Sequence, residues 1–192
     1  MIPELSANDM KMFYQYLDKA TVYFEYGSGG STYQANLRPN IQKIYTVESD
    51  KTWMNKLKSC IKDDSKITYI YSEMGTKPKT WGYPSKSCDK SNLINYSEHI
   101  RNLSVEERSK IDLVMVDGRF RVACCLKFFE VINDGCYIVF DDFLPRKKYH
   151  IILNYYDIVE KTENKRMVVL RKKKNVSMPT DKIVKNYELI PD

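Results

Sequence analysis

The stretch TVYFEYGSGGSTYQANLRP, from Thr21 to Pro39, decides the fold of this chain. An apolar run ends at the acid Glu25, three glycines follow within four positions, and a helical pattern then begins. Gly27 and Gly29 would let the chain turn sharply and bring its backbone close to a ligand. The next helix begins at Gly30, Ser31 and Thr32, and its first N–H groups could donate hydrogen bonds to a carboxylate or phosphate. We therefore expect a strand, a ligand-binding turn and a helix.

The rest of the chain repeats this alternation of strand and helix. Strands are predicted at 21–26, 43–49, 66–72, 111–118 and 136–143, and helices at 6–20, 31–37, 51–61, near 98–107, at 120–131 and at 149–156. Two shorter strands within 157–173 flank a turn at 163–165. Parallel neighbours need a covering element between them, so the pattern predicts an α/β fold. We expect a Rossmann-like, doubly wound, mostly parallel sheet that ends in an antiparallel hairpin.

Length and composition favour one domain that spans residues 1–192. A chain of 192 residues with 43% hydrophobic content can bury one sizeable core. We expect an N-terminal helix within 1–20, the core in 21–173 and a loose tail in 174–192. A loop-like insertion, GTKPKTWGYPSKSCDKS, covers 75–91. We expect the segment 72–95 to be mobile without ligand and to close over the site.

The sequence shows no membrane-spanning run and no signal-peptide pattern. The five cysteines are an odd number without CxxC spacing, so neither a disulfide framework nor a zinc site is indicated. We expect a cytoplasmic protein with reduced thiols and no membrane partner.

Two acids near the glycine-rich turn point to the ligand. Ligands of open parallel sheets bind beyond the carboxyl ends of the strands. Glu48 ends the next predicted strand, about twenty residues after the turn, where an acid can accept hydrogen bonds from both ribose hydroxyls. Glu25 stands where a dinucleotide fold has an apolar residue, and an anion there suits a cationic ligand. S-adenosylmethionine carries a ribose, a sulfonium and an amino group, so we expect it as the cofactor.

From Thr21 to Lys173 the chain resembles the class I S-adenosylmethionine-dependent methyltransferases. The resemblance is carried by FEYGSGGST, TVESD, VMVDG and the final hairpin. The chain departs from the family pattern at Ser31, where a third alternate glycine is expected. The resemblance implies that Glu25 addresses the methionine part of the cofactor, Glu48 the ribose, and Ser72 with Glu73 the adenine. The full expected cofactor-binding set is Glu25, Gly27, Ser28, Gly29, Ser31, Thr32, Glu48, Ser72, Glu73 and Asp117.

Three carboxylates at two strand ends suggest how an acceptor oxygen could lose its proton. Asp117 ends the fourth predicted strand, and Asp141 and Asp142 end the fifth. They are an oxygen donor set suited to Mg²⁺, which would lower the pKa of an acceptor hydroxyl. The alternative is that Asp142 caps the next turn and Asp117 acts alone as a general base. We expect Asp117, Asp141 and Asp142 to be the catalytic and metal-binding residues.

The acceptor is predicted from an aromatic cluster and a pair of arginines. Trp81 and Tyr83 lie in a polar insertion with no obvious core to join, and aromatic faces suit sugar rings. Arg119 and Arg121 could pair with Asp117 or hold an anionic acceptor. The motifs WGYP and VDGRFRVACCLKFF also resemble short methyltransferases associated with glycan synthesis. We therefore expect O-methylation of a small-molecule or glycan hydroxyl, with a sugar favoured.

The basic charge is concentrated near the C-terminus. The net charge is +6, and nine Lys or Arg against two acids lie between Lys161 and Lys185. This segment could bind nucleic acid, which makes an RNA methyltransferase the alternative enzyme, or it could be the solvated, RKKK-bearing edge of the sheet. A cofactor-binding but inactive scaffold is the third interpretation.

Overall fold

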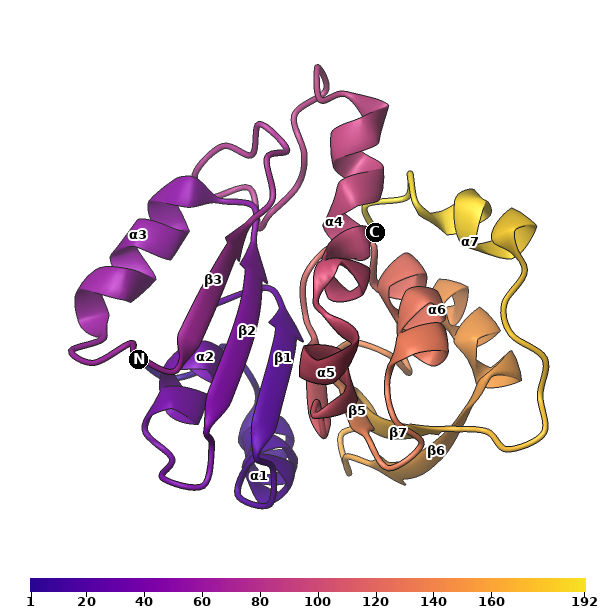
Figure 1. The fold of residues 1–192 in the computed structure, drawn as a ribbon, viewed down its shortest axis with the longest axis horizontal. Coiled ribbons are helices and arrows are strands. Elements are labelled where there is room, and N and C mark those ends of the chain that lie inside the picture. The colour runs from indigo at the N-terminus through magenta and orange to yellow at the C-terminus, as the bar shows by residue number, and fades with distance from the viewer.

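The computed structural model describes residues 1–192 and contains one seven-stranded sheet with helices on both faces (Figure 1). The strands are β1 Val22–Tyr26, β2 Lys43–Glu48, β3 Ile67–Tyr71, β4 Leu113–Val116, β5 Tyr137–Phe140, β6 Tyr156–Lys161 and β7 Val168–Lys172. Their order is β3-β2-β1-β4-β5-β7-β6. The strands β1 to β5 are parallel, and β7 runs antiparallel to both of its neighbours. The predicted fold class is confirmed.

Alternating side chains of β1 separate two cores. Val22, Phe24 and Tyr26 belong to the larger core, whereas Tyr23 belongs to the smaller one on the opposite face. This division follows from the two-residue period of a strand. The helices are α1 Ala7–Leu17, α2 Gly30–Asn36, α3 Lys51–Cys60, α4 Lys90–Asn102, α5 Val105–Ser109, α6 Arg121–Val131, the 3-10 helix η1 Lys147–Asn154, and α7 Asp181–Tyr187. The first three pack on the smaller core, and α4, α6, η1 and α7 on the larger.

The helix predicted near 98–107 is two helices in the structure. The first, α4, begins at Lys90, so the irregular insertion is shorter than predicted. Leu103 has extended backbone, which ends α4, and Ser104 starts α5 with a capping box. The Ser104 hydroxyl accepts from the Glu107 N–H at 3.2 Å, and the Glu107 carboxylate accepts from the Ser104 N–H at 2.9 Å. The reciprocal cap explains why one predicted helix divides in two.

The prediction of a loose tail is wrong, because the last residues pack on the larger core. Helix α7 places Val184 in that core. The fully buried Lys127 of α6 lies 2.6 Å from the Glu188 carboxylate and 2.7 Å from that of Glu98 in α4, through its Nζ atom. The segment from α7 onward is thus tied to α4 and α6 by a buried ion network as well as by apolar contacts.

The basic RKKK sequence does not form the edge of the sheet. Its first two residues lie in β7, which pairs on both sides, and the edge strand is β6. The Lys172 ammonium donates to the Ile132 carbonyl at 2.5 Å, and the Arg171 guanidinium donates to the Asp134 carbonyl at 3.1 Å. Part of the predicted basic patch is therefore engaged in contacts within the protein. None of the helices is both long and apolar enough for a bilayer crossing.

Candidate functional site

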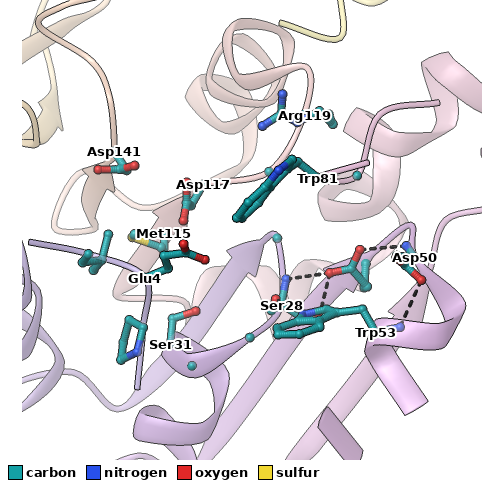
Figure 2. Close-up of a pocket in the computed structure, with 18 of the residues that line it drawn as sticks. Glu4, Ser28, Ser31, Asp50, Trp53, Trp81, Met115, Asp117, Arg119 and Asp141 are labelled. Carbon is teal, nitrogen blue, oxygen red and sulfur yellow. Dashed lines mark hydrogen bonds between the residues drawn. The ribbon is translucent and has the colours of Figure 1, made fainter. Parts of the chain in front are cut away.

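A cavity of about 950 Å³ opens at the carboxyl ends of β1, β2, β4 and β5 (Figure 2). This is the point between β1 and β4 where the strand order reverses, as expected for a ligand site in such a sheet. The turn after β1 enters the cavity at Gly27, which has φ +93°. A Cβ there would lie 2.9 Å from the Gly118 nitrogen, so only glycine lets this turn approach the end of β4.

Glu25 lies behind the glycine-rich turn and does not line the cavity. Its fully buried carboxylate accepts hydrogen bonds from the hydroxyls of Tyr23 at 2.9 Å, Ser31 at 2.6 Å and Thr32. Thr32 in turn accepts from the Gly29 N–H at 2.9 Å. Burial raises the pKa of Glu25 to about 7. In this structure Glu25 fixes the turn from below, and its implied contact with the methionine part of the cofactor stays a prediction.

Glu48 lines the cavity at the end of β2, where it was predicted. One carboxylate oxygen accepts from the Ser28 N–H at 3.2 Å and the Ser28 hydroxyl at 2.8 Å. The other accepts from the N–H groups of Ser49 at 2.7 Å and Asp50 at 2.8 Å. These four donors use the four acceptor directions of a carboxylate. Ribose hydroxyls would reach Glu48 by displacing the Ser28 hydroxyl or sharing its acceptor.

Trp53 forms one wall of the same half of the cavity and was not predicted. Its indole N–H donates to the Ser28 carbonyl at 2.8 Å, and its ring lies 3.6 Å from where a Cβ of Gly29 would be (Figure 2). Asp50 caps α3 by accepting from the Trp53 N–H at 3.0 Å. The position of Trp53 in the first turn of the helix after Glu48 is the sequence signal that could have identified it.

Two predicted adenine contacts are not among the residues that line the cavity. Ser72 is buried, and its N–H donates to the Glu48 carbonyl at 2.8 Å. Glu73 is exposed and accepts from the Gly75 N–H at 3.1 Å. In this structure Ser72 supports the β2 end, and Glu73 stabilises its own loop.

Asp117 lines the cavity at the end of β4 (Figure 2). One of its oxygens accepts from the Arg121 guanidinium at 3.0 Å, and the other has no partner. Arg121 is buried and also donates to the carbonyls of Gly118 at 2.9 Å and Asp141 at 2.7 Å. The turn between them passes through Phe120, which is buried with φ +53°. Of the two roles predicted for Arg121, pairing with Asp117 is confirmed, and its other hydrogen bonds hold this turn. Contact of Arg121 with an acceptor stays a prediction.

The carboxylates of Asp141 and Asp142 pair with arginines, and no group of three acidic, histidine or cysteine side chains could hold a metal ion. Asp141 lies 3.1 Å from Arg166. Asp142, with φ +60°, lies 2.5 Å from Arg146 and 2.7 Å from Arg166. Burial, followed by repulsion from the two neighbouring aspartates, raises the pKa of Asp141 to about 7. The predicted Mg²⁺ set of Asp117, Asp141 and Asp142 is therefore not formed, because each of the three carboxylates is paired with an arginine.

The mouth of the cavity brings together three of the predicted acceptor-binding residues. Arg119 lies over the Tyr83 ring, with its guanidinium carbon 4.6 Å from the ring centre, and donates to the Asp192 carbonyl at 2.6 Å. Trp81, with φ +54°, is 73% exposed at the edge of the cavity (Figure 2). The Ser49 hydroxyl donates to the Gly82 carbonyl at 3.2 Å and so ties this loop to the residues that follow β2.

The N-terminal residues 1–5 also line the cavity, which no sequence pattern predicts. We call this segment the N-terminal strap. It crosses the start of α2, where a Cβ on Gly30 would lie 2.3 Å from the backbone of Ile2. The Gln34 amide donates to the Met1 carbonyl at 2.9 Å, and Pro3 is buried. The strap covers the side of the cavity nearest the glycine-rich turn.

Solved structures share this architecture. A methyltransferase-like protein from Silicibacter pomeroyi superposes with a TM-score of 0.84 at 23% identity, covering 99% of each chain. An RNA methyltransferase from Salinibacter ruber, in complex with S-adenosylhomocysteine, gives a TM-score of 0.56 at 14% identity over 94% of this chain and 98% of that one. A ribosomal protein L11 methylase from Lactobacillus delbrueckii gives 0.54 at 11% identity, over 86% and 77%. No protein-family model matches the chain, and no curated protein matches it.

The chain therefore has the class I methyltransferase fold. The similar structures carry different acceptors in their names, an RNA in one and a ribosomal protein in another, so the fold alone leaves the acceptor open.

Proposed function

We propose that this protein is an S-adenosylmethionine-dependent methyltransferase that methylates a hydroxyl of a small molecule or glycan, with a sugar favoured. The observation that carries the cofactor assignment is the cavity at the switch point of a class I fold, bounded by the glycine-rich turn and Glu48. Its volume of about 950 Å³ lies within the range of small-molecule sites.

The residues around the turn fit such a cofactor. Gly27, Ser28 and Ser31 line the cavity with the small residues of the turn, and Trp53 offers an aromatic wall. The bound cofactor would supply a methyl group activated by its sulfonium. The chain's own task is to hold an acceptor oxygen in line with that methyl and to receive its proton.

Asp117 suits the second task as a general base. Arg121 fixes one of its oxygens and leaves the other open to the cavity. An acceptor hydroxyl that donates to this free oxygen would pass its proton to Asp117 as the new carbon–oxygen bond forms. The donor set around Asp141 and Asp142 does not suit a metal, so no step is assigned to one.

Trp81 supports the preference for a sugar acceptor. An aromatic face that is 73% exposed at the rim of a polar cavity has no packing role in this structure, and such faces suit the apolar side of a sugar ring. The RNA alternative is less well supported, because Arg171 and Lys172 of the basic segment have partners within the protein.

Incubation with methyl-labelled S-adenosylmethionine and separate pools of nucleotide sugars, glycans and RNA tests the proposal. We expect label in the carbohydrate pools and its loss with Trp81→Ala. Label in RNA, with binding that weakens steeply in salt, would select the RNA methyltransferase instead. Cofactor binding without transfer to any pool would select the inactive scaffold.

A further inference from the structure

Six carboxylates line the cavity, and Glu4 is the one without a partner. The other five have donors within the protein, as described above for Glu48, Asp50, Asp117, Asp141 and Asp142. Glu4 makes no hydrogen bond or ion pair, and its side chain points toward Met115 and Asp117 (Figure 2). A carboxylate left unpaired in a cavity is an available site for a cationic group.

The strap holds Glu4 at this place from both sides. Before it, Pro3 is buried and the Ile2 backbone rests against Gly30, while Met1 accepts from Gln34. After it, Leu5 packs on the smaller core, and the hydroxyl of Ser6 caps α1 by accepting from the Asp9 N–H at 3.2 Å. The backbone of Glu4 is thus held at the cavity by anchored residues on both sides, and its exposed carboxylate lines the cavity.

We propose that Glu4 is the residue that contacts the sulfonium of S-adenosylmethionine, an inference that rests on the function proposed above. The sequence offered Glu25 for the cationic part of the cofactor, but Glu25 is sealed behind the turn by three hydroxyl donors. Asp117 is partly neutralised by Arg121. Glu4 is the remaining anion beside the end of β4, where the methyl group would be transferred.

This contact would distinguish substrate from product. On transfer, the bond from sulfur to the methyl carbon breaks, its electron pair stays on sulfur, and the methyl forms a bond to the acceptor oxygen. The acceptor proton passes to Asp117. The sulfonium becomes a neutral thioether, so Glu4 loses its attraction to the product S-adenosylhomocysteine. Glu4 thereby favours binding of S-adenosylmethionine over retention of S-adenosylhomocysteine.

Calorimetry with both cofactors, on the wild type and Glu4→Gln, tests the inference. An exposed carboxylate gains a modest amount from one ion pair, so we expect Glu4→Gln to weaken S-adenosylmethionine binding about fivefold. Binding of S-adenosylhomocysteine should change by less than about twofold, because its sulfur is uncharged. The preference should also shrink in high salt, where exposed charges are screened. Glu163→Gln, an exposed acid on the β6–β7 turn, is the matched control and should change neither affinity.

Equal weakening of both cofactors, or no change in either, would overturn the role of Glu4 while leaving the proposed function intact. Failure of the wild type to bind either cofactor would overturn the proposed function and this inference together. Gly30→Ala provides a second test, because the added Cβ would displace the N-terminal strap while the Glu4 residue itself is not substituted. We expect it to lower the preference for S-adenosylmethionine over S-adenosylhomocysteine as Glu4→Gln does.

Discussion

The two halves of the cavity are formed by different kinds of chemical groups. The half under β1 and β2 uses backbone N–H groups and short hydroxyls that converge on Glu25 and Glu48, both of them buried. The half under β4 and β5 uses long arginines paired with aspartates, and its rim carries an exposed tryptophan. The first half is held by hydrogen bonds within the protein, and in the proposed function it is the cofactor half. The second half presents paired charges and an exposed aromatic face, and in the proposed function it is the acceptor half.

Asp117→Asn should give the largest effect, and the effect should be confined to the acceptor half. The amide cannot take the acceptor proton, so we expect turnover to fall roughly 10²- to 10⁴-fold with cofactor affinity nearly unchanged. Steady-state kinetics and calorimetry with S-adenosylhomocysteine measure the two quantities. Asp157→Asn, an exposed aspartate on β6, is the matched control. Full activity of Asp117→Asn on the true acceptor would move the chemistry elsewhere.

Glu48→Ala should show the converse behaviour, with the loss in cofactor binding. Removing the carboxylate deprives the ribose of its acceptor and frees four donors, so S-adenosylhomocysteine affinity should fall by about 2–4 kcal/mol. Calorimetry gives the loss, and circular dichroism checks that the chain remains folded. Undiminished affinity would mean that the four existing hydrogen bonds keep Glu48 from the ribose, which would make it a purely structural acid like Glu25.

Glu25 should make the cofactor half sensitive to pH. Its pKa in the folded protein is raised to about 7, so the folded state holds the proton more tightly than the unfolded chain does. The corresponding stabilisation is complete below the ordinary pKa and is lost as the pH rises through 7. We expect the stability of wild type relative to Glu25→Gln to fall by about 2–3 kcal/mol between pH 4.5 and 8. Urea unfolding of both proteins across this range measures the difference, and parallel pH profiles would contradict the assignment.

Removal of metal ions with EDTA should have the smallest effect of these changes. If methyl transfer is unaffected, the contrast between the two halves of the cavity becomes sharper. Because Arg121, Arg146 and Arg166 already neutralise the three aspartates, EDTA should leave methyl transfer unchanged. The assay is methyl transfer after dialysis against EDTA, with and without added Mg²⁺. Loss of activity that Mg²⁺ restores would show that the arginines move aside for a metal.

The sequence predicted which strand ends and loops surround the cavity, but not how their side chains pair, for a physical reason. Strand ends, glycine spacing and the acid at Glu48 are local patterns, and they determined the sheet and the position of the cavity. The sealing of Glu25 depends on hydroxyls that α2 brings beneath it, and Arg166, which pairs with both Asp141 and Asp142, comes from the β6–β7 turn. No local pattern encodes those pairings, so three acids at neighbouring strand ends resembled a metal site.

The strap and the packed tail escaped prediction for a related reason. Residues 1–5 have no periodic pattern, and their contact with Gly30 is visible only when α2 is in place. The composition of the tail predicts a loose segment, whereas its anchoring depends on Lys127 in α6. The strap lines the cavity and the tail packs on the larger core, and both are held by contacts between distant parts of the chain.

The buried ammonium of Lys127 has a consequence for how this protein can diverge. It lies between Glu98 and Glu188, and removing one member of a buried ion network leaves an uncompensated charge at a cost of about 3–5 kcal/mol. Replacing all three with apolar residues of similar volume avoids that cost. We therefore expect substitutions at these three positions to occur together. In related sequences, 98, 127 and 188 should covary, and the intermediates between an ionic and an apolar version should be rare.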